Sequence, residues 1–237
     1  MDSLIGSTIF AAACFLVFLC CKWFDKRLLL GFGFLFVVYI GIDDVLTGLP
    51  SLVHATNLIH GDWNWSGKIY SLLFSCMVIV GLRIDTASVG LTLTQKNLKS
   101  SLVAFSLLTL LSFSIGFIFK PELPNVETIA FQALMPGLAE EIAYRGIAPA
   151  LLLGLIQSKS GSNDIPWATI VITGVAFGLW HGIGYSHSKL SFDFMSAIFP
   201  LIGGIAYGWL RFNSGSLLLP IIGHGLGNNV FYLPSLT

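Results

Sequence analysis

Ionisable and amide side chains lie inside stretches of the sequence that are otherwise apolar. In one such stretch Glu140 and Glu141 precede Arg145. Glu141 and Arg145 are four residues apart, so on a helix they share a face and can form an ion pair. Glu140 points about 100° away from that face and therefore needs a partner on another helix or in a water-filled pocket. A carboxylate in such a position suits a general acid or base.

Two later apolar stretches carry a histidine with a second residue four positions away. Phe177 shares a helical face with His181, and His224 shares one with Asn228. The His224–Asn228 pair could donate two hydrogen bonds to one oxygen, as oxyanion stabilisation requires. Structural explanations stay open beside this one: a buried Glu–Arg pair, an interfacial histidine, and interhelical hydrogen bonds worth about 0.6–2 kcal/mol.

Together, one carboxylate, two histidines and an amide have the chemistry to activate a water molecule and to stabilise an oxyanion. The same groups could also serve as ligands to a metal ion. The sequence contains no HExxH motif, so the helix that carries zinc in many peptidases is absent.

The composition of the chain indicates the environment in which these groups lie. Of the 237 residues, 55% are hydrophobic and only 10% are charged, whereas a soluble domain has about 25% charged residues. The deficit extends along the whole chain, so the sequence predicts a multi-pass membrane protein and not a soluble domain with one anchor. A formal net charge of zero and the lack of a basic run argue against a nucleic-acid partner.

We predict an all-α, polytopic transmembrane bundle of about eight spans, because each helix that crosses a bilayer core needs about 20 apolar residues. The candidate spans are Leu4–Trp23, Leu28–Leu49, Ile69–Leu82, Leu102–Phe119, Thr128–Ile156, Ile165–Gly182, Phe192–Leu210 and Ser216–Leu233. A single transmembrane domain, 1–237, accounts for them, with a motif-bearing core at about 126–233. A charge at the bilayer centre costs about 2.5–3.5 kcal/mol on insertion scales, so we expect a polar cavity among the late helices.

The connections between the predicted spans are short. The polar stretch Gly61–Lys68 contains two tryptophans and suits an interfacial loop. The stretch Thr86–Ser100 is mixed in character and predicts an amphipathic helix on the surface. Five titratable residues outside the motifs are predicted to lie in loops or at the interface: Asp43, Asp44, His54, His60 and His187.

Three motifs follow one another in the late spans: EExxxR starts at Glu140, FxxxH ends at His181, and HxxxN joins His224 to Asn228. In this order and at these separations they resemble the CPBP (Abi) family. That family includes the type II CAAX prenyl endopeptidases and proteins linked to bacteriocin processing and self-immunity. The resemblance covers roughly 130–232, and the first half of the chain shares only its apolar character.

The resemblance implies an intramembrane protease with a conical cavity among its helices. It assigns water activation to Glu140 and His181, oxyanion stabilisation to His224 and Asn228, and a supporting role to Glu141 and Arg145. The expected partners are the lipid bilayer and a membrane-associated peptide or protein substrate, prenylated or not. The expected location is a bacterial or archaeal cell membrane.

The cofactor stays open at this point, since family members are often labelled metalloproteases while a metal-free glutamate mechanism is also argued for them. If Zn²⁺ is present, the expected ligands are Glu140, His181 and His224. The pairing of His224 with Asn228 favours the metal-free mechanism, because an amide is a poor zinc ligand.

Three functions fit the residues. The first is an intramembrane endopeptidase, of the CAAX or the bacteriocin-processing type. The second is a proton- or ion-coupled transporter that uses Glu140, His181 and His224 as a relay. The third is an immunity or scaffold protein that keeps the fold without chemistry. The three motifs, all filled with reactive residue types, favour the endopeptidase.

Overall fold

The computed structural model describes residues 2–154 and 165–236, which form an all-α bundle with one short hairpin, as the fold class predicted. The longer helices are α1 (Asp2–Phe24), α2 (Leu30–Leu52), α3 (Trp65–Gly81), α4 (Leu98–Phe119), α7 (Trp167–Gly182), α8 (Phe194–Ser214) and α9 (Leu218–Val230). Between α4 and α7 the chain forms α5 (Val126–Met135), the π-helical segments η2 (Pro136–Glu140) and η3 (Ile142–Ile147), and α6 (Ala148–Leu152). Two 3-10 turns are η1 (His54–Thr56) and η5 (Leu233–Leu236).

Each predicted span overlaps a helical segment, although several begin a few residues too early, and the seventh begins at Phe192 on strand β2. The end of the fifth span at 155–156 lies outside the described residues. Among the described residues, four helices are long and apolar enough to cross a membrane, namely α1, α2, α4 and α8. Helices α3 and α7 are shorter and also apolar. The architecture is therefore that of a membrane helix bundle.

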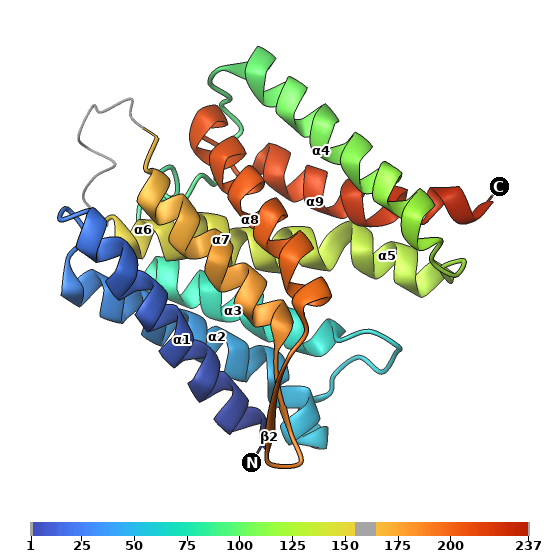
Figure 1. The fold of residues 1–237 in the computed structure, drawn as a ribbon, viewed down its shortest axis with the longest axis horizontal. Coiled ribbons are helices and arrows are strands. Elements are labelled where there is room, and N and C mark those ends of the chain that lie inside the picture. Colours follow the sequence, from blue (N-terminus) through green and yellow to red (C-terminus); the bar gives the residue numbers. More distant parts are fainter. Residues whose placement is uncertain (1, 155–164, 237) are drawn as a thin grey trace.

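The helices are arranged around the middle pair α7 and α8. Figure 1 shows α1 and α2 side by side at one edge of the molecule and α4 at the opposite edge, with α7 and α8 between them. Helix α7 packs along α8 and also against α1, while α9 packs against both α4 and α5. The fifth span thus lies between the first three helices and the last ones, where its charged residues meet neighbours from both sides.

The fifth span stays helical from Val126 to Leu152, as predicted for one long helix, but its middle turns are π-helical. Helix α5 ends at Met135, and Pro136 begins η2. Proline has no N–H to donate to the preceding turn, and the chain widens there into π-helical turns, which frequently occur at functional sites. Glu141 joins the two π-helical segments. The glutamates of the first motif therefore lie on widened turns of helix.

Glycines bring the late helices into close contact with these turns. A Cβ atom on Gly174 of α7 would lie 2.6 Å from Cγ1 of Ile205 on α8. A Cβ atom on Gly137 of η2 would lie 2.5 Å from the carbonyl oxygen of Ile221 on α9, and one on Gly225 would clash with α5. Small residues at such crossings let helix backbones approach, and here they bring the histidine of α9 next to the glutamates of the fifth span.

The hairpin joins α7 to α8. Strands β1 (Ile183–Ser186) and β2 (Lys189–Phe192) pair antiparallel. His187 lies in the turn with a φ of 50°, a backbone conformation typical of tight hairpin turns. It is exposed, and so are His54 and His60 between α2 and α3, so the predicted loop positions of these three histidines are confirmed.

The predicted amphipathic helix over Thr86–Ser100 is wrong. The segment forms turns and bends, and α4 begins only at Leu98. Gly90 has a φ of 81°, outside the helical region, and Arg211 of α8 donates a hydrogen bond to the carbonyl oxygen of Ser88 at 2.8 Å. Backbone hydrogen-bonding groups of this segment are paired within turns and with the Arg211 side chain of α8, so they do not require a helix.

Candidate active site

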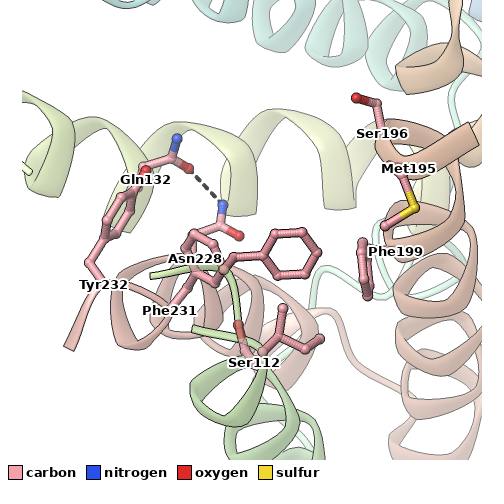
Figure 2. Close-up of a pocket in the computed structure, with 10 residues that line it drawn as sticks. Ser112, Gln132, Met195, Ser196, Phe199, Asn228, Phe231 and Tyr232 are labelled. Carbon is pink, nitrogen blue, oxygen red and sulfur yellow. Dashed lines mark hydrogen bonds between the residues drawn. The ribbon is translucent and has the colours of Figure 1, made fainter. Parts of the chain in front are cut away.

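A cavity of about 780 Å³ lies among α3, α4, α5, η2, α7, α8 and α9. The polar side chains that line it include Lys68, Glu140, Arg145, His181, His224 and Asn228. A second hollow of about 440 Å³ shares Ser112, Gln132 and Asn228 with the first, and Figure 2 shows these residues facing Phe199 and Met195 of α8. The predicted polar cavity among the late helices is present, and α3 also forms part of its wall.

Glu140 finds its partner on α3. Its Oε1 atom accepts a hydrogen bond from Nζ of Lys68 at 2.6 Å, and its Oε2 atom lies 3.8 Å from Nε2 of His224. Glu140 and Lys68 are each 7% exposed. The expectation that Glu140 pairs across helices is therefore confirmed, and the partner is a lysine.

The placement of Lys68 in an interfacial loop is wrong. The loop ends earlier, because Asn64 caps the N-terminus of α3 by accepting a hydrogen bond from the N–H of Gly67 at 3.0 Å. Lys68 then lies in the first turn of α3, inside the bundle. Asn64, an N-cap residue type ahead of an apolar run, was the signal in the sequence that could have placed it there.

Glu141 lies beneath the cavity and is fully buried. Its Oε1 atom lies 3.2 Å from Nη1 of Arg145, which confirms the ion pair expected from their spacing. The same oxygen accepts a hydrogen bond from Nδ1 of His224 at 2.7 Å, a contact that spacing alone could not reveal. The guanidinium of Arg145 also stacks over the ring of Phe177, 4.1 Å from its centroid. Glu141 therefore links the first and third motifs.

The two histidines are held in the same way, each through Nδ1. Nδ1 of His181 donates to the carbonyl oxygen of Phe177 at 2.9 Å, since a carbonyl can only accept. Nδ1 of His224 donates to Glu141, and Tyr207 stacks on the same ring at a centroid distance of 5.9 Å. In the neutral form each ring then carries its free lone pair on Nε2. Both histidines can accept a proton there.

Asn228 is held by Gln132 of α5. Nδ2 of Asn228 donates a hydrogen bond to Oε1 of Gln132 at 2.7 Å, drawn as the dashed line in Figure 2. This bond uses one of the two amide hydrogens of Asn228. The predicted pair of donations from His224 and Asn228 to one oxygen stays a prediction, and Gln132 is a residue that the sequence analysis did not select.

Asp43 and Asp44 are not loop residues, which corrects the prediction. Helix α2 continues to Leu52, so both lie inside it. Asp43 is buried and accepts a hydrogen bond from Ser71 Oγ at 2.6 Å, while Asp44 accepts one from Nε1 of Trp180 at 2.7 Å. The hydroxyl and the indole of neighbouring helices satisfy carboxylates that the sequence analysis had assigned to the interface.

The residues do not fit a zinc site. Within residues 2–154 and 165–236, no three His, Cys, Asp or Glu side chains are grouped as metal ligands. The expected set of Glu140, His181 and His224 would also place the ion beside the ammonium of Lys68, which already holds one oxygen of Glu140. Zinc requires ligands at about 2.0–2.2 Å and gains nothing from an adjacent positive charge.

Comparison with known proteins gives one match. Residues 122–230 match a protein family described as "Type II CAAX prenyl endopeptidase Rce1-like". No protein of curated function and no solved structure matches the chain. The matched segment starts just before α5 and ends with α9, so it contains the residues of all three motifs and leaves Lys68 outside.

Proposed function

We propose, from the match of residues 122–230 to the Rce1-like family of type II CAAX prenyl endopeptidases, that the chain hydrolyses a peptide bond of a membrane-associated peptide or protein. The family and the apolar helices make it an integral membrane protein of a protease family. One observation carries the proposal: Glu140, His181, His224 and Asn228 line a single cavity inside the bundle.

In the proposed reaction Glu140 and His181 remove a proton from a water molecule, whose oxygen attacks the carbonyl carbon of the substrate. The carbonyl oxygen becomes an oxyanion, and the carbon–nitrogen bond breaks as the new amine takes up the proton. A positioned general base supplies about 10²–10⁴-fold in rate. Two groups with lone pairs facing one cavity, the Glu140 carboxylate and Nε2 of His181, support this assignment.

His224 and Asn228 are proposed to stabilise the oxyanion. Because Nδ1 of His224 already donates to Glu141, Nε2 can donate only when the ring carries both protons. Asn228 keeps one amide hydrogen beyond the one donated to Gln132. Each donor of this kind is worth about 10²–10³-fold in kcat. Glu141 and Arg145 support the site by fixing the ring of His224.

The walls of the cavity favour a substrate with an apolar part. Leu108 and Leu111 of α4, Phe131 of α5, and Phe199 and Ile202 of α8 line it beside the polar groups. We propose that the peptide bond lies at the polar end and that a lipid-modified or apolar segment of the substrate lies along these side chains. A prenylated cysteine is one such segment.

The test uses the purified protein in liposomes with two internally quenched peptides. One ends in an S-farnesyl-cysteine followed by three residues, as in a CaaX sequence, and the other carries the same peptide on a transmembrane anchor. We expect cleavage of at least one, loss of about 10²-fold or more in kcat for Glu140→Gln, and no effect of a chelator. Lys99→Met, which changes an exposed lysine in the first turn of α4, serves as the control.

The alternatives give different outcomes in the same preparation. Ion flux that depends on Glu140, with no cleavage of either peptide, would support a transporter. If cells carrying Glu140→Ala or His224→Ala keep the phenotype of the wild type, the protein acts as a scaffold or immunity factor without chemistry.

A further inference from the structure

Lys68 is a positive charge that the first half of the chain contributes to the cavity. Its Nζ atom lies 2.6 Å from Oε1 of Glu140, and the side chain is 7% exposed. A lysine is almost never buried without a partner, and a membrane interior makes an unpaired charge more costly still. The residue lies outside 122–230, the segment that matches the family.

A second contact restrains the same ammonium group. Nζ of Lys68 lies 4.4 Å from the ring centroid of Trp180 on α7, a cation–π arrangement. The indole is itself fixed, because its Nε1 atom donates to Asp44 of α2 at 2.7 Å. Lys68 is thus held between a carboxylate and an aromatic face, and three other segments of the fold, α2, α7 and η2, determine where its charge lies.

The contact leaves the two oxygens of Glu140 with different surroundings. Oε1 is engaged by Lys68, while Oε2 faces Nε2 of His224 at 3.8 Å, which is longer than a hydrogen bond. Charged and titratable groups around Glu140 come from five packed elements: Asp43 of α2, Lys68 of α3, Arg145 of η3, His181 of α7 and His224 of α9. Arg145 is paired with Glu141, so the permanent charge in contact with Glu140 is that of Lys68.

We propose that Lys68 is a positioning residue for the hydrolysis. Its ammonium group holds Glu140 as a carboxylate and, by engaging Oε1, leaves Oε2 facing Nε2 of His224. The proposal rests on the proposed function. It places one residue that the reaction needs, Lys68, on α3, outside the segment that matches the family. An ion pair that served only folding would change the stability of the protein and leave the pH dependence of turnover as it is.

Three variants and one control test this in liposomes with the two quenched peptides. Lys68→Met and Lys68→Gln remove the charge, Lys68→Arg keeps it, and Lys99→Met removes an exposed lysine of similar helical position on α4. Having two neutral variants keeps the test available if one does not fold, and thermal unfolding of each variant in detergent checks its fold. The measurements are kcat, KM and the pH dependence of kcat.

We expect the neutral variants to lose about 10²-fold in kcat with KM changed by less than about twofold. The acidic limb of the pH profile should move to higher pH, because the carboxylate has lost its counter-charge. Lys68→Arg should restore the limb and most of kcat, and Lys99→Met should match the wild type. Wild-type kcat and pH profile in a folded neutral variant, with Glu140→Gln inactive, would overturn the role of Lys68 alone. Wild-type turnover by Glu140→Gln would instead overturn the proposed function.

Discussion

The two halves of the chain contribute different things to one cavity. The segment 122–230, from α5 to α9, carries the glutamates, the histidines and the asparagine of the three motifs. The segment before it, α1 to α4, supplies the counter-charge Lys68, the indole anchor Asp44 and part of the apolar wall. The motif-bearing segment thus holds the reactive groups but depends on the preceding segment for the positive charge that balances Glu140.

The largest effect on stability is expected in the motif-bearing segment. Replacing Arg145 by Met leaves the fully buried Glu141 with its ion-pair partner removed, and breaking a buried pair from one side costs about 3–5 kcal/mol. Unfolding in detergent should show this loss. A double variant, Arg145→Met with Glu141→Leu, should recover much of it, and an unchanged unfolding midpoint for the single variant would show that the pair does not stabilise the fold.

The largest remaining effect on turnover is expected at the amide. Asn228→Ala removes a proposed oxyanion donor and should lower kcat by about 10²–10³-fold with little change in KM. Asn228→Asp keeps the size of the side chain but replaces the amide donor by a carboxylate, so its kcat should be no higher than that of Asn228→Ala. Near wild-type kcat in Asn228→Ala would place the oxyanion elsewhere in the cavity.

A smaller effect is expected in the first half of the chain. Ser71→Ala removes the 2.6 Å hydrogen bond that Ser71 donates to the buried Asp43. An unsatisfied buried polar group costs about 1–3 kcal/mol. The unfolding free energy should fall by that amount, and kcat should change far less than in Asn228→Ala. If Ser71→Ala abolished turnover in a folded protein, the first half of the chain would contribute to the reaction more directly than through charge balance and the apolar wall.

The smallest effect is expected at the start of α8, where Asp193 is not among the residues that line the main cavity. Asp193 accepts hydrogen bonds from the N–H groups of Met195 and Ser196 and from the hydroxyl of Ser196, and these bonds hold the pKa of its carboxyl below the usual value. Because the pKa is lowered in the folded state, the cap stabilises the protein above the unfolded pKa and loses this effect as pH falls through the folded one.

Asp193→Ala should therefore unfold at a lower temperature than the wild type near neutral pH. The difference should vanish as the pH drops through the range where Asp193 becomes protonated, and kcat should be unaffected. A difference in unfolding temperature that is constant over this range would exclude the carboxylate as its source.

Sequence patterns predicted the bundle and part of the site for clear physical reasons. Apolar length sets the spans, and the four-residue spacing of Glu141 and Arg145 sets their ion pair. The family predicted from the three motifs is confirmed by the match over 122–230. Each of these features depends on residues that are close in the chain or on a fixed helical period.

The features that the sequence did not reveal depend on contacts between distant segments. Lys68 follows a polar stretch with two tryptophans, and although Asn64 signals the start of a helix, no residue near Lys68 in the chain indicates that Glu140 lies opposite it. Asp43 is satisfied by a hydroxyl on another helix. No local pattern encodes such pairings.

The catalytic role of Glu140 is tested by the turnover of Glu140→Gln in liposomes, measured beside Glu141→Gln. The two residues are neighbours of the same type, but Glu140 lines the cavity, whereas Glu141 does not line it and is fully buried. We predict that folded Glu140→Gln loses about 10²-fold or more in kcat, and that its unfolding temperature also falls, because the buried Lys68 loses its ion-pair partner. Glu141→Gln should mainly lower the unfolding temperature. Equal kcat for the wild type and Glu140→Gln on a peptide that the wild type cleaves would contradict the catalytic role of Glu140.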